Sequence, residues 1–260
     1  MRIDPIEMTI ISKKGAEKRL ISIGSVAGAR FSSRDIEGTR KKLDDMIVRE
    51  GYFTAATLTN PSIFRIGRYL LTQAPEFDVQ GPLTGGECEV VAIRDGDEIL
   101  VSVGSDQCDR ELDPLFPDKP KQMCPHPIAS AAWPYEEVRD HWDMLRASSE
   151  ITAGGHVIPT QDNPLSALVN LEFLLAMEVV RALPDPMFLY GGSGPFLGSV
   201  AQKVKQLGLP EETAMGVAEA FLVRLHDPIL NRTIEHQYSA RPVGDDYAER
   251  RDRRRIVRDP

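Results

Sequence analysis

Three acidic residues in one stretch of the chain have the types and spacing of metal ligands. Glu87, Glu89 and Asp106 lie within GGECEVVAIRDGDEILVSVGSDQCDRELD, residues 85–113. The density of β-branched and apolar residues predicts a strand on each side of the turn-forming RDGDE. Alternate side chains of a strand share a face, so Glu87 and Glu89 point the same way, roughly 7 Å apart.

Whether Asp106 joins the two glutamates depends on the length of the turn. A two-residue loop at Asp95-Gly96 puts Glu87 opposite Gly104, with Asp106 as its diagonal neighbour on the same face. A four-residue loop puts Asp106 directly opposite Glu87. A three-residue loop sends Asp106 to the other face unless a bulge corrects the register.

Such a triad is costly without a cation. Three like charges at this spacing, partly shielded from water, repel by roughly 6 kcal/mol in total. Carboxylate oxygens suit a hard ion such as Mg²⁺, Mn²⁺ or Ca²⁺ rather than zinc. The alternative interpretation is an exposed acidic strand face in an acidic protein.

The order of several motifs resembles the metal-binding pattern of the fumarylacetoacetate hydrolase superfamily. There, a Glu-x-Glu strand is followed by a strand that ends in Asp, with an Arg four residues later. GECEVVAI and GSDQCDRE match this pattern with Glu87, Glu89, Asp106 and Arg110. The resemblance implies that the three acids bind Mg²⁺ or Mn²⁺, with Ca²⁺ also possible, and that Arg110 binds substrate.

Other segments extend the resemblance over roughly residues 5–242. Matching segments are PSIFRIGRYLLTQAPEFDV (61–79), KPKQMCPHPIASAAW (119–133) and FLYGGSGPFLG (188–198). They imply that Lys121 acts in catalysis and substrate binding, and that Ser193 and its neighbour Gly192 bind substrate. LLTQ, GSDQCDRELD, KQMCPHPIA and DHWDML are similar to one branch of the superfamily, catalogued as a domain of unknown function.

The resemblance also implies a fold and a class of reaction. The fold is mixed α+β, a coiled β core (β-roll) with peripheral helices, in one catalytic domain over residues 1–244 of a homodimer. The implied protein is a metal-dependent hydrolase that acts on a small oxo-acid or related carboxylate.

The chain departs from its apparent relatives in one respect. Carbon–carbon hydrolases of the superfamily activate water with a His–Glu pair upstream of the metal motif, and this chain has no histidine before His126. His126, in the proline-rich loop, is therefore the candidate general acid or base. A lyase or isomerase that uses the same metal, such as a decarboxylase or dehydratase, and a non-catalytic ligand-binding protein stay open as alternatives.

Composition narrows the class of protein. A formal net charge of −8 argues against nucleic-acid binding, which needs a basic face. Three cysteines without metal-ligand spacing, and no apolar run after the N-terminus, indicate a cytoplasmic protein. No segment has the pattern of a membrane span. Residues 245–260 are dense in charge and predict a solvated tail, with a dimer-clasping arm as the alternative.

The remaining pattern predicts the elements around these motifs. The expected elements are a hairpin over 8–25, a helix over 31–51, strands over 61–106, a helix over 134–151, an apolar helix over 163–183, a strand over 187–194 and a hairpin over 216–240.

Overall fold

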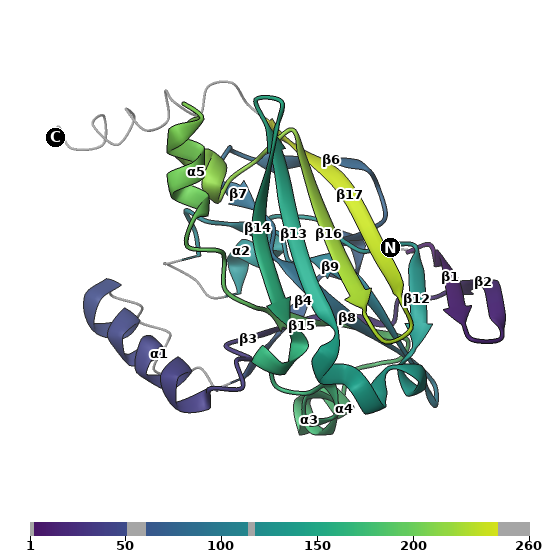
Figure 1. The fold of residues 1–260 in the computed structure, drawn as a ribbon. Helices are drawn as coiled ribbons and strands as arrows, with labels where there is room; N and C mark the ends of the chain where they lie inside the picture. The colour runs from purple at the N-terminus through teal and green to yellow at the C-terminus, as the bar shows by residue number, and fades with distance from the viewer. Residues whose placement is uncertain (1–2, 51–60, 114–117, 244–260) are drawn as a thin grey trace, which may run out of the picture.

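The computed structural model describes residues 3–50, 61–113 and 118–243, and only the backbone of residues 46–50. The architecture is mixed α+β, with two large sheets and few helices (Figure 1). The predicted tail over residues 245–260 lies outside the described residues.

The larger sheet has eight strands in the order β2-β1-β12-β9-β8-β15-β3-β4. Its strands are β1 (Ile6–Ser12), β2 (Gly15–Ile21), β3 (Ser25–Arg30), β4 (Ser62–Ile66), β8 (Cys88–Asp95), β9 (Glu98–Ser105), β12 (Ala131–Pro134) and β15 (Met187–Ser193). Most neighbours are antiparallel, and β15 pairs in parallel with β3.

The smaller sheet has five strands in the order β14-β13-β16-β17-β6. Its strands are β6 (Glu76–Gln80), β13 (Arg146–Ala153), β14 (His156–Pro164), β16 (Ala220–Asp227) and β17 (Arg232–Val243). Two short ladders join β5 (Leu71–Thr72) to β11 (His126–Pro127) and β7 (Thr84–Gly85) to β10 (Cys108–Asp109).

The described helices are α1 (Ile36–Glu50), α2 (Lys119–Gln122), α3 (Leu171–Ala176), α4 (Glu178–Arg181) and α5 (Val200–Gln206), with 3₁₀ turns η2 (Arg68–Leu70), η3 (Tyr135–Glu137), η4 (Arg139–Met144), η5 (Leu165–Ala167) and η6 (Glu211–Ala214). The helices α1, α3, α4 and α5 lie around the periphery of the sheets, whereas the short α2 lies among the strands in the view of Figure 1. In the described part of the chain, no helix has the length and apolar character needed to cross a membrane.

Side chains on both faces of strand β8 are buried. Val90 and Ala92 belong to a core cluster that also contains Ile158 and Val223 of the smaller sheet. Val91 and Ile93 belong to a second cluster on the opposite face. Because side chains alternate along a strand, Cys88 faces the smaller sheet and Glu89 faces away from it.

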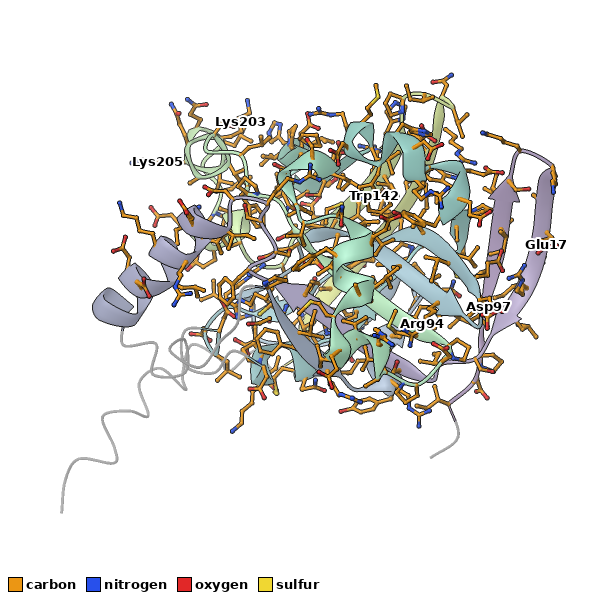
Figure 2. All side chains as sticks on the ribbon, turned by 90° about the horizontal axis from the view of Figure 1, so that it is seen from below. Glu17, Arg94, Asp97, Trp142, Lys203 and Lys205 are labelled. Atoms are coloured by element: carbon orange, nitrogen blue, oxygen red, sulfur yellow. The ribbon has the colours of Figure 1, made fainter. Side chains whose placement is uncertain are left out.

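Both predicted hairpins and several other elements are confirmed. β1 and β2 form the opening hairpin, which projects at one edge with Glu17 near its tip (Figure 2). β16 and β17 form the late hairpin, and β15 is the strand expected over 187–194. α1 occupies most of 31–51 and is capped by Asp35, whose Oδ1 accepts the N–H of Gly38 at 2.9 Å.

Two predicted helices are wrong. Residues 134–151 form η3 and η4 and then β13, because the backbone of His141 leaves the helical region and burial alternates residue by residue from Arg146. Residues 163–183 are divided among the end of β14, η5, α3 and α4. Asn170 caps α3, and extended backbone at Met177 separates it from α4.

Candidate active site

The β8–β9 hairpin places Asp106 directly across from Glu87. The loop is two residues long but consists of Gly96 and Asp97, one position later than the Asp95-Gly96 loop considered from the sequence. Glu89 is therefore paired with Gly104. Just beyond the strand ends, the N–H of Asp106 donates to the carbonyl oxygen of Glu87 at 3.0 Å.

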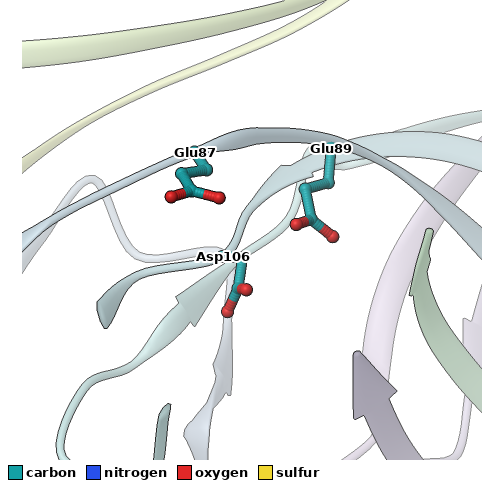
Figure 3. A group of neighbouring side chains, drawn as sticks. All are labelled: Glu87, Glu89 and Asp106. Carbon is teal, nitrogen blue, oxygen red and sulfur yellow. The ribbon is translucent and has the colours of Figure 1, made fainter. Parts of the chain in front are cut away.

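The three predicted ligands converge in space (Figure 3). One carboxylate oxygen from each of Glu87, Glu89 and Asp106 lies within 4.8 Å of the other two. All three residues line a cavity of about 710 Å³. Glu89 and Asp106 are buried, and Oδ1 of Asp106 has no hydrogen-bond partner. A hard divalent cation such as Mg²⁺ or Mn²⁺ fits this set of oxygen donors.

Two cations balance the charge of the acids. Arg110 donates to Oε1 of Glu87 at 2.8 Å, and the ammonium of Lys121 forms an ion pair with Asp106. Burial by itself would raise the pKa of Glu87. The nearby charges of Arg110 and Lys121, together with hydrogen bonds from Ser193 and Arg110, outweigh burial and lower that pKa from 4.5 to about 2.

Burial shifts the pKa values of Glu89 and Lys121 in opposite directions. Burial raises the pKa of Glu89, an effect that Glu87 adds to and Lys121 opposes. Burial likewise lowers the pKa of Lys121, although the two glutamates oppose this shift. Glu89 therefore accepts a proton more readily than a glutamate in water, and Lys121 releases one more readily than a lysine in water. Both shifts favour proton exchange at this point of the cavity.

The glycine loop, residues 191–198, begins within the end of β15 and contacts both glutamates. The N–H of Gly192 donates to Oε2 of Glu89 at 2.8 Å, and Oγ of Ser193 donates to Oε2 of Glu87 at 2.5 Å. Gly192 has φ of +91°, and a Cβ there would lie 1.8 Å from Oγ of Ser32. Only glycine fits this close approach. Both loop residues also line the cavity.

His126 lies behind the acids rather than in the cavity. Its ring is fully buried and its Nε2 is 2.7 Å from the carbonyl oxygen of Lys121. Nδ1 lies 3.4 Å from Oδ1 of Asp106 without a hydrogen bond. Burial lowers the pKa of His126 to about 3. This position suits a residue that supports Lys121 and Asp106, whereas its predicted role as acid or base stays a prediction.

The segment before α1 forms a wall of the cavity that the sequence patterns did not indicate. Arg30, Phe31, Ser32 and Arg34 all line it. Arg30 pairs with Asp113, and Phe31 has φ of +58°. A positive φ at a residue with a side chain is uncommon, and no sequence signal announces it.

The fold is similar to those of several solved structures at low sequence identity. Crystal structures of Cg1458 are 12% identical, with a TM-score of 0.56 over 87% of this chain and 80% of that one. The apo form of 2-keto-3-deoxy-D-arabinonate dehydratase is 14% identical, with a TM-score of 0.58 over 88% of this chain and 77% of that one. The same dehydratase complexed with magnesium and 2,5-dioxopentanoate has a TM-score of 0.57 at 14% identity, over 86% of this chain and 76% of that one.

No curated protein matches this chain in sequence. One family model matches the chain from β3 to β17, a range that includes every predicted metal ligand. The match covers residues 29–238, and the chain belongs to the family described as protein of unknown function (DUF2848).

Proposed function

We propose that this protein is a divalent-metal-dependent lyase that removes water from a small 2-oxo carboxylate. The observation that carries the proposal is the carboxylate triad in the cavity, with Lys121 beside it. The fold is similar to that of a dehydratase complexed with magnesium and an oxo-acid. We also place the chain in the fumarylacetoacetate hydrolase superfamily, with its coiled β core.

The three acids would hold Mg²⁺ or Mn²⁺, and the unpartnered Oδ1 of Asp106 is a ready ligand atom. A bound cation would supply Lewis acidity toward a substrate carbonyl. Arg110 and the hydroxyl of Ser193 border the same space and would orient the substrate carboxylate.

Lys121 is the candidate for proton transfer. Elimination of water from a 2-oxo acid requires a base to take a proton from the carbon next to the carbonyl and an acid to protonate the departing hydroxyl. The Lys121 ammonium lines the cavity, and burial brings its pKa below the ordinary value. The same nitrogen can therefore hold or release a proton close to neutral pH.

The positions of the histidines favour elimination over hydrolysis. Hydrolysis needs a group that activates water, for which a histidine beside the cavity would be suited. None of the described residues that line the cavity is a histidine. All five histidines of the sequence lie in the described part of the chain. Lys121 could carry out both proton transfers of an elimination without a second base.

A product analysis separates the candidate reactions. Purified protein with Mn²⁺ would be incubated with a panel of hydroxylated 2-oxo acids, acylpyruvates and oxaloacetate, followed by mass spectrometry. The proposal requires a product lighter than its substrate by one water. Products from carbon–carbon cleavage by water would support the hydrolase, and loss of carbon dioxide would support a decarboxylase. Metal binding without turnover would indicate a ligand-binding protein.

The homodimer implied by the resemblance and the cytoplasmic location indicated by the cysteines and the N-terminal sequence stay predictions. Light scattering on the purified protein would give its mass in solution, and a value near one chain of 28.9 kDa would contradict the dimer.

A further inference from the structure

We propose that Gln161 and Tyr238, two buried residues of the five-stranded sheet, are positioning residues for the metal site. This inference rests on metal binding by the acids as proposed above. Neither side chain lines the cavity, so each acts through the segments that carry the ligands. Both are almost completely buried, with 1% and 2% of their surfaces exposed.

The ligands and their supports lie on opposite sides of the same hairpin. Glu89 faces the cavity, whereas Cys88 faces the five-stranded sheet. Ser105 is paired with Cys88 across the hairpin and is fully buried. Contacts from behind can therefore fix the backbone of the ligand segments without occupying the space of a metal or a substrate.

Gln161 joins the Glu-x-Glu segment to the glycine loop. Its Oε1 accepts the N–H of Cys88, the residue between the two glutamates, at 2.8 Å. Its Nε2 donates to the carbonyl oxygen of Gly194, next to Ser193, at 2.9 Å. The ladder between β8 and β15 is irregular at this point, after Tyr190. The amide side chain thus links two segments where regular strand pairing is interrupted.

Tyr238 performs the same task on the other strand of the hairpin. Its hydroxyl lies 2.8 Å from Oγ of Ser105 and donates to Oε1 of Gln107 at 2.7 Å. These two residues flank Asp106 on both sides. The ring packs against Phe77 and Phe221, so the position of the hydroxyl is fixed by the core of the sheet.

Together, the two side chains hold the segments of all three ligands against one rigid sheet. Metal affinity depends on how closely the empty site approaches the geometry of the occupied site, and loss of an outer contact commonly costs 10–100-fold in affinity. Because these residues hold backbone and neighbours rather than the ligands themselves, we expect the lower end of that range.

Two conservative substitutions with matched controls test the inference. Tyr238→Phe removes only the hydroxyl. Gln161→Met removes, at similar volume, the two hydrogen bonds described above and the one that Oε1 accepts from Ser149. The controls are Tyr135→Phe, a buried tyrosine bonded to Glu172 away from the cavity, and Ser25→Ala, a buried hydroxyl at the start of β3 that donates to the carbonyl oxygen of Pro184. Mn²⁺ affinity would be measured by electron paramagnetic resonance of the free ion, and stability of the metal-free protein by urea unfolding.

We expect Tyr238→Phe and Gln161→Met each to weaken Mn²⁺ binding about 10-fold. The control variants should keep wild-type affinity within about 2-fold even where their metal-free stability falls by a similar amount. If Gln161→Met does not fold, Tyr238→Phe, which removes a single hydroxyl, carries the test.

Equal affinity in wild type and both test variants would overturn the inference and leave the proposed function standing. Weakening of the controls to the same extent would also overturn it, because the effect would then follow stability alone. A wild-type protein that binds no Mn²⁺ would remove the proposed function, and the positioning role with it.

Discussion

The backbone N–H of Gly192 donates a hydrogen bond of 2.8 Å to the carboxylate of Glu89, across 103 positions of sequence. Glu89 has its charge buried, and this amide is one of the few groups that stabilise its ionised form. The glycine loop therefore has two tasks, since it borders the cavity and also orients Glu89, a proposed metal ligand.

Gly192→Ala should damage both stability and the site. The positive φ and the contact with Ser32 would together lower the free energy of unfolding by about 2–4 kcal/mol. Gly155→Ala is the matched control, because Gly155 has φ of +73° but open space around it. We expect the control to cost about 1–2 kcal/mol in urea unfolding. Equal losses of unfolding free energy in the two variants would contradict the close contact between Gly192 and Ser32.

Glu89→Ala should abolish metal binding while the protein stays folded. For wild type, Mn²⁺ at 100 times its dissociation constant would add about 2.7 kcal/mol to the free energy of unfolding. The variant should show no such increase in thermal or urea unfolding. Glu235→Ala, which removes an exposed partner of Arg224, serves as the control and should keep the full increase. Stoichiometric binding by Glu89→Ala would contradict the proposed ligand set.

Lys121→Met should separate catalysis from metal binding. Without its partner, the buried Asp106 carboxylate would cost the metal-free protein about 3–5 kcal/mol of stability. Added Mn²⁺ should restore much of this loss. Turnover should fall at least about 100-fold with metal affinity retained, because the proton-transfer group is absent. Lys203→Met, on the exposed face of α5, is the control and should behave as wild type (Figure 2). Undiminished turnover by Lys121→Met would exclude it as the base.

Thiol reactivity should be very low in the folded protein. Burial raises the pKa of Cys88 and of Cys124 from 9.0 to about 12. At pH 8 the thiolate fraction of each is therefore reduced about 1000-fold, and each further pH unit restores only about a factor of ten. Cys108 is buried with its pKa shifted in the same direction. Ellman's reagent should label none of them until urea is added, and rapid labelling at pH 8 would contradict this burial.

The Glu-x-Glu hairpin was predictable because its information is local. Strand alternation puts Glu87 and Glu89 on one face, and a Gly-containing turn fixes the distance to Asp106. The turn begins one residue later than the simplest reading of Asp95-Gly96, which is a small error in position. The observed turn still brings the three acids together, because it places Asp106 directly opposite Glu87 instead of diagonal to it.

The wrong helices show where local patterns fail. Val138, Trp142 and Leu145 have helical spacing and are buried, yet Trp142 lies in the 3₁₀ turn η4 and the other two flank that turn. Apolar spacing over two turns does not distinguish an α-helix from such turns, and the following strand from Arg146 was hidden by its polar residues. Gln161 and Tyr238 carried no signal at all, because their partners are 73 and 133 positions distant.

The distance in sequence between Tyr238 and Ser105 has a consequence for how a newly synthesised chain acquires its metal. The acidic hairpin is made first, but its backing strand is among the last parts described here to leave the ribosome. Contacts so far apart form late in folding. We therefore expect the proposed ion capture to follow the synthesis of residue 238, and a nascent fragment that ends before this residue should fail to take up Mn²⁺.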